Sequence, residues 1–205
     1  MKKLLIVISL FASETSFSQK IIPVFGLEGG ALFGGLSEQA GYENSTDFTG
    51  SFFIDLIGVN KREKPTVGIK FKFTYSPYNM KYTQSFLNPP PDISIRETTV
   101  SALLKFCLAS KTNYYNQKGE DDKIHSVKDV RGLFLLAGPQ IGFVSITGGE
   151  SNYAKNNYSI IVGAEYHINR LYLFVCRQIA FTEIYPSKTS VRLNSLSAGI
   201  GIPLL

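Results

Sequence analysis

The residues of this sequence that could do chemistry are ionisable side chains placed at alternate positions of apolar segments. The set is Asp55, Lys70, Lys72, Glu97, Lys105, Glu165 and Arg177. Cations and carboxylates are nearly balanced in it, and burial of any one charge without a partner would cost several kcal/mol. We interpret the set as a structural polar cluster inside a narrow tube. An ion path or a binding site is the alternative.

Histidines, cysteines and acidic clusters offer little for catalysis or metal binding. We expect both histidines on the periplasmic side, away from an outer-leaflet substrate. The acidic residues near one histidine fit no metal motif, and the cysteines lie far apart in separate apolar runs. The groups considered are His125, His167, Asp121, Asp122, Asp129, Cys107 and Cys176. We therefore predict no catalytic residue, no metal, no cofactor and no enzyme activity.

Two short motifs have plausible structural roles. The glycine-rich run 26–35 lacks the Gly-Lys-Ser/Thr ending of a phosphate loop, and we expect it to permit bending and close backbone approach in a strand. The triplet Pro89-Pro90-Pro91 should stiffen a long connection, 78–92, that carries several aromatic residues. That connection either caps one end of the fold or docks a partner.

Length, composition and the first residues set the class of protein. The 205 residues suit one domain, and 44% hydrophobic residues exclude a disordered chain. The formal charge of +5 is spread along the chain, so we expect no nucleic-acid partner. Lys2, Lys3 and the apolar run 4–12 predict a secretory signal peptide over 1–19. We assign 20–205 to one domain.

Alternation of apolar and polar residues predicts strands throughout the domain. In the clearest stretch, Ile69, Phe71 and Phe73 share one face while Lys70 and Lys72 share the other, a separation that a helix would not give. We expect eight such stretches, at 21–36, 46–60, 65–77, 93–109, 131–147, 156–168, 171–183 and 191–203. A three-residue turn between the sixth and seventh would place Glu165 diagonal to Arg177.

Connections between the predicted strands alternate between long and short. This alternation is typical of an up-and-down transmembrane barrel, with long extracellular loops and short periplasmic turns. The sequence therefore predicts an all-β fold, an eight-stranded antiparallel up-and-down transmembrane β-barrel. The segment 110–130 is an exception, because it is long, polar and on the periplasmic side. We expect no regular structure there.

Four segments together resemble the PorT-like outer-membrane β-barrel family of Bacteroidetes-type bacteria. They are TTVSALLKFCL at 98–108, LFLLAGPQIGFV at 133–144, NYSIIVGAEYHIN at 157–169 and LYLFVCRQIAFTEI at 171–184. The resemblance spans nearly the whole domain. It implies an outer-membrane barrel and permits a role in protein secretion or envelope assembly.

Alternation alone does not say which face of a barrel is inside. A soluble lipocalin-like barrel would turn its apolar face inward, toward a small apolar ligand, whereas a membrane barrel turns it toward lipid. The signal peptide and the resemblance favour the membrane. We expect tyrosines at its two boundaries, namely Tyr75, Tyr78, Tyr82, Tyr153, Tyr158, Tyr166 and Tyr172.

The sequence thus predicts a small non-enzymatic protein of the outer membrane with a side-chain-filled lumen. It would act as a structural or interaction protein through its loops. We expect outer-membrane lipid and lipopolysaccharide as its surroundings, and an envelope protein as a further partner. The alternatives are a lipid-modifying membrane enzyme and the soluble ligand-binding barrel.

Overall fold

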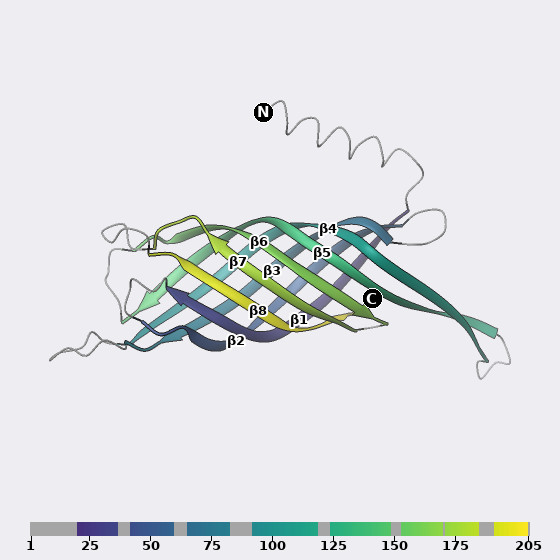
Figure 1. The fold of residues 1–205 in the computed structure, drawn as a ribbon, viewed down its shortest axis with the longest axis horizontal. Helices are drawn as coiled ribbons and strands as arrows, with labels where there is room; N and C mark the ends of the chain where they lie inside the picture. Colours follow the sequence, from purple (N-terminus) through teal and green to yellow (C-terminus); the bar gives the residue numbers. More distant parts are fainter. Residues whose placement is uncertain are drawn as a thin grey trace, which may run out of the picture.

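Eight antiparallel strands close into one barrel in the computed structural model (Figure 1). Each strand pairs with the next along the chain, and the first pairs with the last. The strands are β1 (Lys20–Leu36), β2 (Ser45–Val59), β3 (Pro65–Met80), β4 (Ile93–Lys118), β5 (Ile124–Thr147), β6 (Asn156–Ile168), β7 (Leu171–Ala180) and β8 (Leu193–Pro203). The predicted eight-stranded antiparallel up-and-down barrel is confirmed.

The structure describes residues 20–36, 42–59, 65–82, 92–118, 124–148, 153–169, 171–184 and 191–204. For 112–118 and 124–130 it describes the backbone alone. The predicted signal peptide, the proline triplet, Asp121 and Asp122 therefore lie outside the described residues. Among those described, no helix is long and apolar enough to cross a membrane.

The two ends of the barrel differ in their connections. The connections 60–64, 119–123 and 169–170 lie at one end, which we call the hairpin end. Residues 37–44, 81–92, 148–155 and 181–192 connect strands at the other, which we call the loop end. In Figure 1 the hairpin end is on the right.

Strands β4 and β5 continue beyond the barrel at the hairpin end as a two-stranded ribbon (Figure 1). Their pairing runs on to Lys118↔Ile124, past a bulge at 107–109. The expectation of an irregular segment at 110–130 is wrong for 110–118 and 124–130. Backbone hydrogen bonds can continue between polar residues, and a ribbon with both faces in water needs no apolar alternation.

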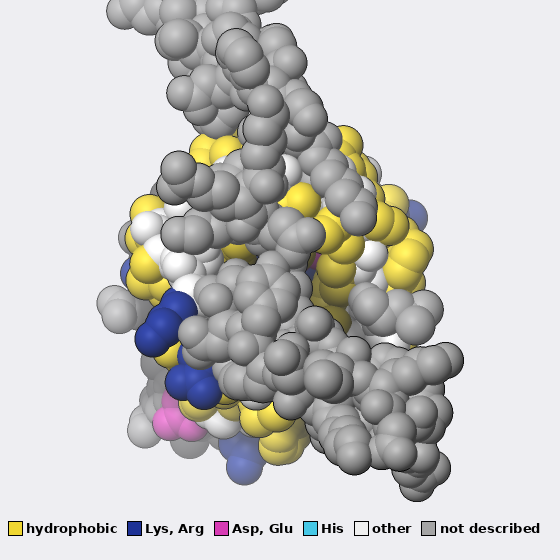
Figure 2. Space-filling view, turned by 90° about the vertical axis from the view of Figure 1, so that its right-hand side faces the viewer, with side chains coloured by type: hydrophobic (Ala, Val, Ile, Leu, Met, Phe, Trp, Pro, Cys, Tyr) yellow, Lys and Arg dark blue, Asp and Glu magenta, His cyan; other side chains and the backbone are white. Residues whose placement is uncertain are grey.

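Apolar side chains cover the outside of the barrel and polar ones fill much of its inside. Strand β7 alternates strictly between exposed and buried positions, with Leu173 and Val175 outside and Phe174 and Cys176 inside. Figure 2, viewed onto the hairpin end, shows hydrophobic side chains around the outer wall. Most large side chains exposed on the wall are therefore apolar. Such a surface is expected of a barrel whose wall contacts lipid.

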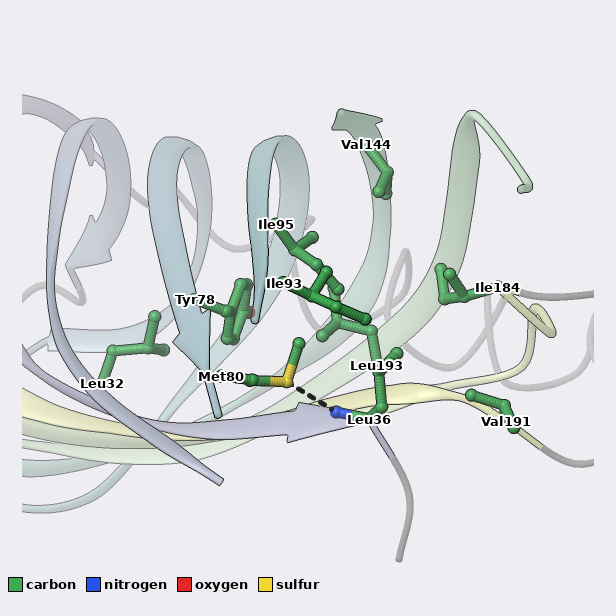
Figure 3. Packing of buried hydrophobic residues seen from close by; sticks show 10 residues of the cluster. All are labelled: Leu32, Leu36, Tyr78, Met80, Ile93, Ile95, Val144, Ile184, Val191 and Leu193. Atoms are coloured by element: carbon green, nitrogen blue, oxygen red, sulfur yellow. Dashed lines mark hydrogen bonds between the residues drawn. The ribbon is translucent and has the colours of Figure 1, made fainter. Parts of the chain in front are cut away.

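An apolar cluster fills the barrel at the loop end (Figure 3). It draws on five strands and on the segments that flank β7 and β8. Its buried members are Leu32, Leu36, Tyr78, Met80, Ile93, Ile95, Val144, Ile184, Val191 and Leu193. The backbone N–H of Ile184 donates to the carbonyl of Val191, and the carbonyl of Ile184 accepts from the N–H of Ala154. These two hydrogen bonds connect the described ends of the connecting segments to one another. We call this the apolar cap.

The tyrosines divide between the two faces. Tyr75, Tyr158 and Tyr166 point outward and are about half exposed, as expected for rings at a lipid boundary. Tyr78 and Tyr172 are buried inside the barrel, at 0% and 1% exposure, so their placement at a lipid boundary is wrong. Tyr82 packs edge-on against Tyr42, and Tyr153 packs against the apolar cap.

Candidate functional site

The ammonium group of Lys70 lies at the centre of a buried ionic cluster toward the hairpin end. It contacts the carboxylates of Glu28, from β1, and Glu165, from β6. It also donates to the Tyr172 hydroxyl at 2.9 Å, and that hydroxyl donates to Glu28 at 2.6 Å. One lysine on β3 thus joins strands from three other parts of the wall.

Two further lysines extend this cluster. Lys105 Nζ lies 2.5 Å from Asp55 Oδ2 and 2.7 Å from Glu165 Oε2. Lys72 forms an ion pair with Glu28. Three lysines therefore meet three carboxylates, so the ionised cluster has no formal net charge. We call the residues Glu28, Asp55, Lys70, Lys72, Lys105 and Glu165 the ionic cluster.

Aromatic rings surround the ammonium groups. Lys70 Nζ lies 4.2 Å from the Phe53 ring centroid and 4.5 Å from that of Tyr172. Lys105 Nζ lies 4.6 Å from the Phe134 centroid, and Lys72 Nζ lies 4.9 Å from that of Phe174. These are distances at which a ring face attracts a cation. The rings fill the tube while adding favourable contacts to the lysines.

Glycines on the inner wall make room for these rings. A Cβ atom on Gly201 would lie 2.0 Å from the Tyr172 ring, and one on Gly26 would lie 2.2 Å from the Phe53 ring. Both distances are shorter than any real contact between carbon atoms. The two glycines on neighbouring strands β1 and β8 therefore allow large rings to cross a narrow interior.

His167 lies at the hairpin end of the ionic cluster. Its Nε2 is 2.9 Å from Glu165 Oε2 and 3.2 Å from Lys105 Nζ, and its ring stacks on Tyr172. The described residues hold no group of three potential ligands placed to bind a metal. His167 packs against Phe134 and Tyr172 and contacts the ionic cluster through Nε2. The side chain of His125 lies outside the described residues.

A layer of hydroxyl and amide groups separates the ionic cluster from the apolar cap. Ser51 bonds Thr74 at 3.0 Å, and Gln140 bonds Ser159 at 3.2 Å. A cavity of about 30 Å³ lies in this layer, lined by Thr49, Lys72, Thr74, Ser76, Thr99, Gln140, Gln178, Ser195 and Ser197 among others. A polar cavity of this size accommodates water but no metabolite.

Glu97 is separate from the ionic cluster and pairs with neutral groups. Asn157 donates to its Oε1 at 2.7 Å, Gln178 donates at 3.1 Å and 3.2 Å to its two oxygens, and Tyr78 donates at 3.2 Å. A Cβ on Gly142 would lie 2.3 Å from Glu97 Oε1. Because Gly142 has no side chain, the Glu97 carboxyl group can extend over β5 and accept a hydrogen bond from Asn157 on β6.

Six of the seven predicted polar-cluster residues are buried inside the barrel, and five of these belong to the ionic cluster. Arg177 is the exception, because it points outward and Gln178 points inward. Glu165 pairs with Phe174, and residues 169–170 form a turn of two residues rather than three. The one-residue difference in register moves Arg177 to the other face. Its placement in the lumen is wrong.

Glu28 is the member of the ionic cluster that the sequence analysis missed. It lies in the glycine-rich run 26–35, where small residues on both faces obscure the alternation. The signal was its parity: Glu28 shares a face with Leu32 and Leu36, opposite the outward Phe25, Leu27 and Phe33. An acidic residue within such a segment needs a buried cation, and Lys70 and Lys72 supply it.

Comparison with known proteins adds one similar fold. No family of known proteins and no curated protein matches the sequence. One similar solved structure is Ail, the attachment invasion locus protein of Yersinia pestis, in complex with the heparin analogue sucrose octasulfate. The sequences are 12% identical, the TM-score is 0.42, and the match covers 89% of this chain and 97% of that chain. The identity is too low for function to be transferred.

Removal of Lys70 tests whether charge balance stabilises the interior. We expect Lys70→Met to lower the free energy of unfolding by about 3–5 kcal/mol, because it leaves three carboxylates against two lysines. Lys70→Met with Glu165→Gln restores equal numbers and should cost less than the single change. The folded fraction across a urea series in detergent micelles measures both.

Lys155→Met is the control, because Lys155 is exposed and should change stability by no more than about 0.5 kcal/mol. A double variant that is as unstable as Lys70→Met would contradict the role of charge balance.

Proposed function

We propose that this chain is a small non-enzymatic outer-membrane barrel with a closed lumen, which acts by presenting its ends to other envelope components. The observation that carries the proposal is the inversion of polarity. Charged side chains are buried in the lumen, while Phe71, Phe73 and Leu173 are among many large apolar side chains exposed on the wall. In water such a surface would aggregate, whereas in a bilayer it is the required one.

The lengths of the connections support one orientation of the barrel. Long connections gather at the loop end, and the three at the hairpin end, 60–64, 119–123 and 169–170, are short. Outer-membrane barrels place short turns in the periplasm and long loops outside the cell. The loop end would therefore face outward, and the ribbon of β4 and β5 would reach into the periplasm.

Three layers of side chains support a closed lumen. The ionic cluster fills the hairpin half, the hydroxyl and amide layer fills the middle, and the apolar cap fills the loop end. An eight-stranded barrel is just wide enough for side chains to fill. The cavity described in the middle layer holds only about 30 Å³. Solute passage is therefore not part of the proposed function.

The ribbon supports an interaction role in the periplasm. Beyond Val67↔Phe106 and Arg131↔Ile168, the described parts of β4 and β5 pair with each other alone. Each ribbon strand thus has one edge open for pairing with another extended chain. The resemblance to PorT-like barrels is compatible with a partner in secretion or envelope assembly.

Two other functions remain as hypotheses to be tested against this one. A lipid-modifying enzyme would need a nucleophile and a base together at the loop end. A soluble barrel would need an apolar cavity large enough for its ligand, whereas the cavity in the middle layer holds only about 30 Å³. Changed lipid A in a deletion strain would favour the enzyme, and recovery in a soluble fraction would favour the soluble barrel.

Membrane insertion can be tested by fractionation of the native envelope. We expect the full chain in the outer-membrane fraction, because its apolar wall needs lipid. Unheated protein should also migrate differently from boiled protein on a gel, since a closed barrel resists unfolding by detergent. Recovery as a water-soluble protein with one mobility would contradict the proposal.

The closed lumen predicts no steady ion conductance in planar bilayers. Described side chains fill all three layers of the lumen, so insertion should leave the current at its baseline. A large general porin in the same bilayers provides the positive control. Stable current steps from the purified chain would show an open pore and contradict this part of the proposal.

The interaction role predicts that shortening the ribbon removes a periplasmic partner. Replacement of 112–130 by a short turn should leave the barrel folded, because the pairing of β4 and β5 within the wall is retained. Crosslinking in the envelope, followed by mass spectrometry, should then lose species captured by the unmodified chain. Deletion of 83–91 at the loop end is the control and should retain them. Unchanged crosslinks in the ribbon variant would count against this role.

A further inference from the structure

Arg177 is a cation placed within the apolar outer wall. Its neighbours across the strands are Val162 on β6 and Leu196 on β8, both exposed and apolar. Along its own strand, Val175 precedes it and Ile179 follows it on the same face. Within the described residues, no carboxylate pairs with its guanidinium group.

The position of Arg177 along the wall places it near the loop end but not at its rim. Ile179 and then Phe181 lie further toward the loop end, with 37% and 56% exposure. The apolar wall therefore continues beyond the arginine. Two other arginines on the strands are exposed, and each lies close to a rim. Arg96 is near the start of β4 at the loop end, and Arg131 is at the hairpin end, where the pairing of β5 with β6 begins. Among the described residues, Arg177 is thus an outward charge whose directly paired and same-face neighbours on β6, β7 and β8 are apolar.

A groove of about 320 Å³ opens beside this arginine on the outside of β1, β7 and β8. Its lining includes Phe33, Gly35, Asn44, Arg177, Asn194 and Leu196. Two side-chain amides thus accompany the guanidinium group, and two large apolar side chains lie beside them. The combination offers hydrogen-bond donors to an anion and an apolar surface to a hydrocarbon chain.

A charged side chain on the lipid face of a barrel costs less free energy the closer it lies to the membrane boundary. A phosphate at that boundary removes the remaining cost, because guanidinium groups form paired, charge-assisted hydrogen bonds with phosphate oxygens. In the proposed orientation the groove faces the outer leaflet. The lipids there that carry phosphate on a multi-chain anchor are lipopolysaccharides.

We propose that this groove binds the phosphorylated glycolipid head of lipopolysaccharide, with Arg177 as the phosphate ligand. Asn44 and Asn194 offer further hydrogen bonds, and Phe33 and Leu196 contact an acyl chain. The inference rests on the proposed membrane location and adds a defined lipid site to it. The site would fix the rotation of the barrel relative to its lipid neighbours through the β7–β8–β1 face.

Native mass spectrometry of the full chain in detergent micelles tests the site. The probes are bisphosphorylated lipid A, the same lipid with its phosphates removed, and inorganic phosphate. We expect lipid A to bind and the other two to bind at least about tenfold more weakly, because both the phosphate and the acyl chains are needed. Arg177→Gln should weaken lipid A binding by about tenfold or more.

Arg96→Gln is the matched control, since Arg96 is an exposed arginine on β4, across the barrel from this groove. It should bind lipid A like the unmodified chain. Equal losses in both variants would indicate diffuse charge attraction and overturn the site. Unchanged binding by Arg177→Gln, or equal binding of lipid A without phosphate, would also overturn it.

Folding and membrane insertion are measured separately for each variant by the heat-dependent gel shift and by flotation with vesicles. An unmodified chain that does not insert would refute the proposed function, whereas one that inserts without preferring lipid A would refute the site alone. If Arg177→Gln does not fold, Arg177→Lys replaces it. Lysine keeps the charge but lacks the paired donors, so weaker binding is expected, and unchanged binding would overturn the guanidinium contact.

Discussion

The strongest constraint on this barrel is that each buried ammonium group must lie next to a carboxylate. Lys70 and Lys105 are each 1% exposed, and burial of such charges is tolerable only with partners in reach. The partners come from β1, β2 and β6, which do not all neighbour the lysine strands. Because a one-residue slip of any strand would turn its charge to the outside, the ionic cluster selects one register for the closed sheet.

The volume of the interior imposes a second constraint that depends on the first. Lysines and carboxylates alone would leave gaps, and aromatic rings such as Phe53 and Tyr172 occupy the space between them. The rings fit because Gly26 and Gly201 have no side chains that would occupy the same space. Toward the loop end no lysine is present in the apolar cap, so mostly aliphatic side chains fill the tube there, and the Tyr78 hydroxyl bonds Glu97.

The strands and their number could be predicted because alternation is strong where the outward face is apolar and the inward face is polar. In β3 this signal placed Lys70 and Lys72 on the inner face. Where both faces carry apolar residues, as in β7, parity is ambiguous, and Arg177 was placed on the wrong side. The ribbon could not be predicted because both of its faces are polar, so its sequence shows no alternation. Its pairing depends on backbone hydrogen bonds, which the sequence pattern does not reveal.

The position of Glu97 explains why counting charges could not assign the interior from the sequence. A count of charges expects inward carboxylates to pair with inward cations, and it places Arg177 inside the tube, diagonal to Glu165. The structure instead surrounds Glu97 with the amides of Asn157 and Gln178 and the hydroxyl of Tyr78. At Glu97, hydrogen bonds from several neutral donors satisfy the carboxyl oxygens in place of a cation. Arg177 lies on the outer face of the barrel instead, away from Glu97.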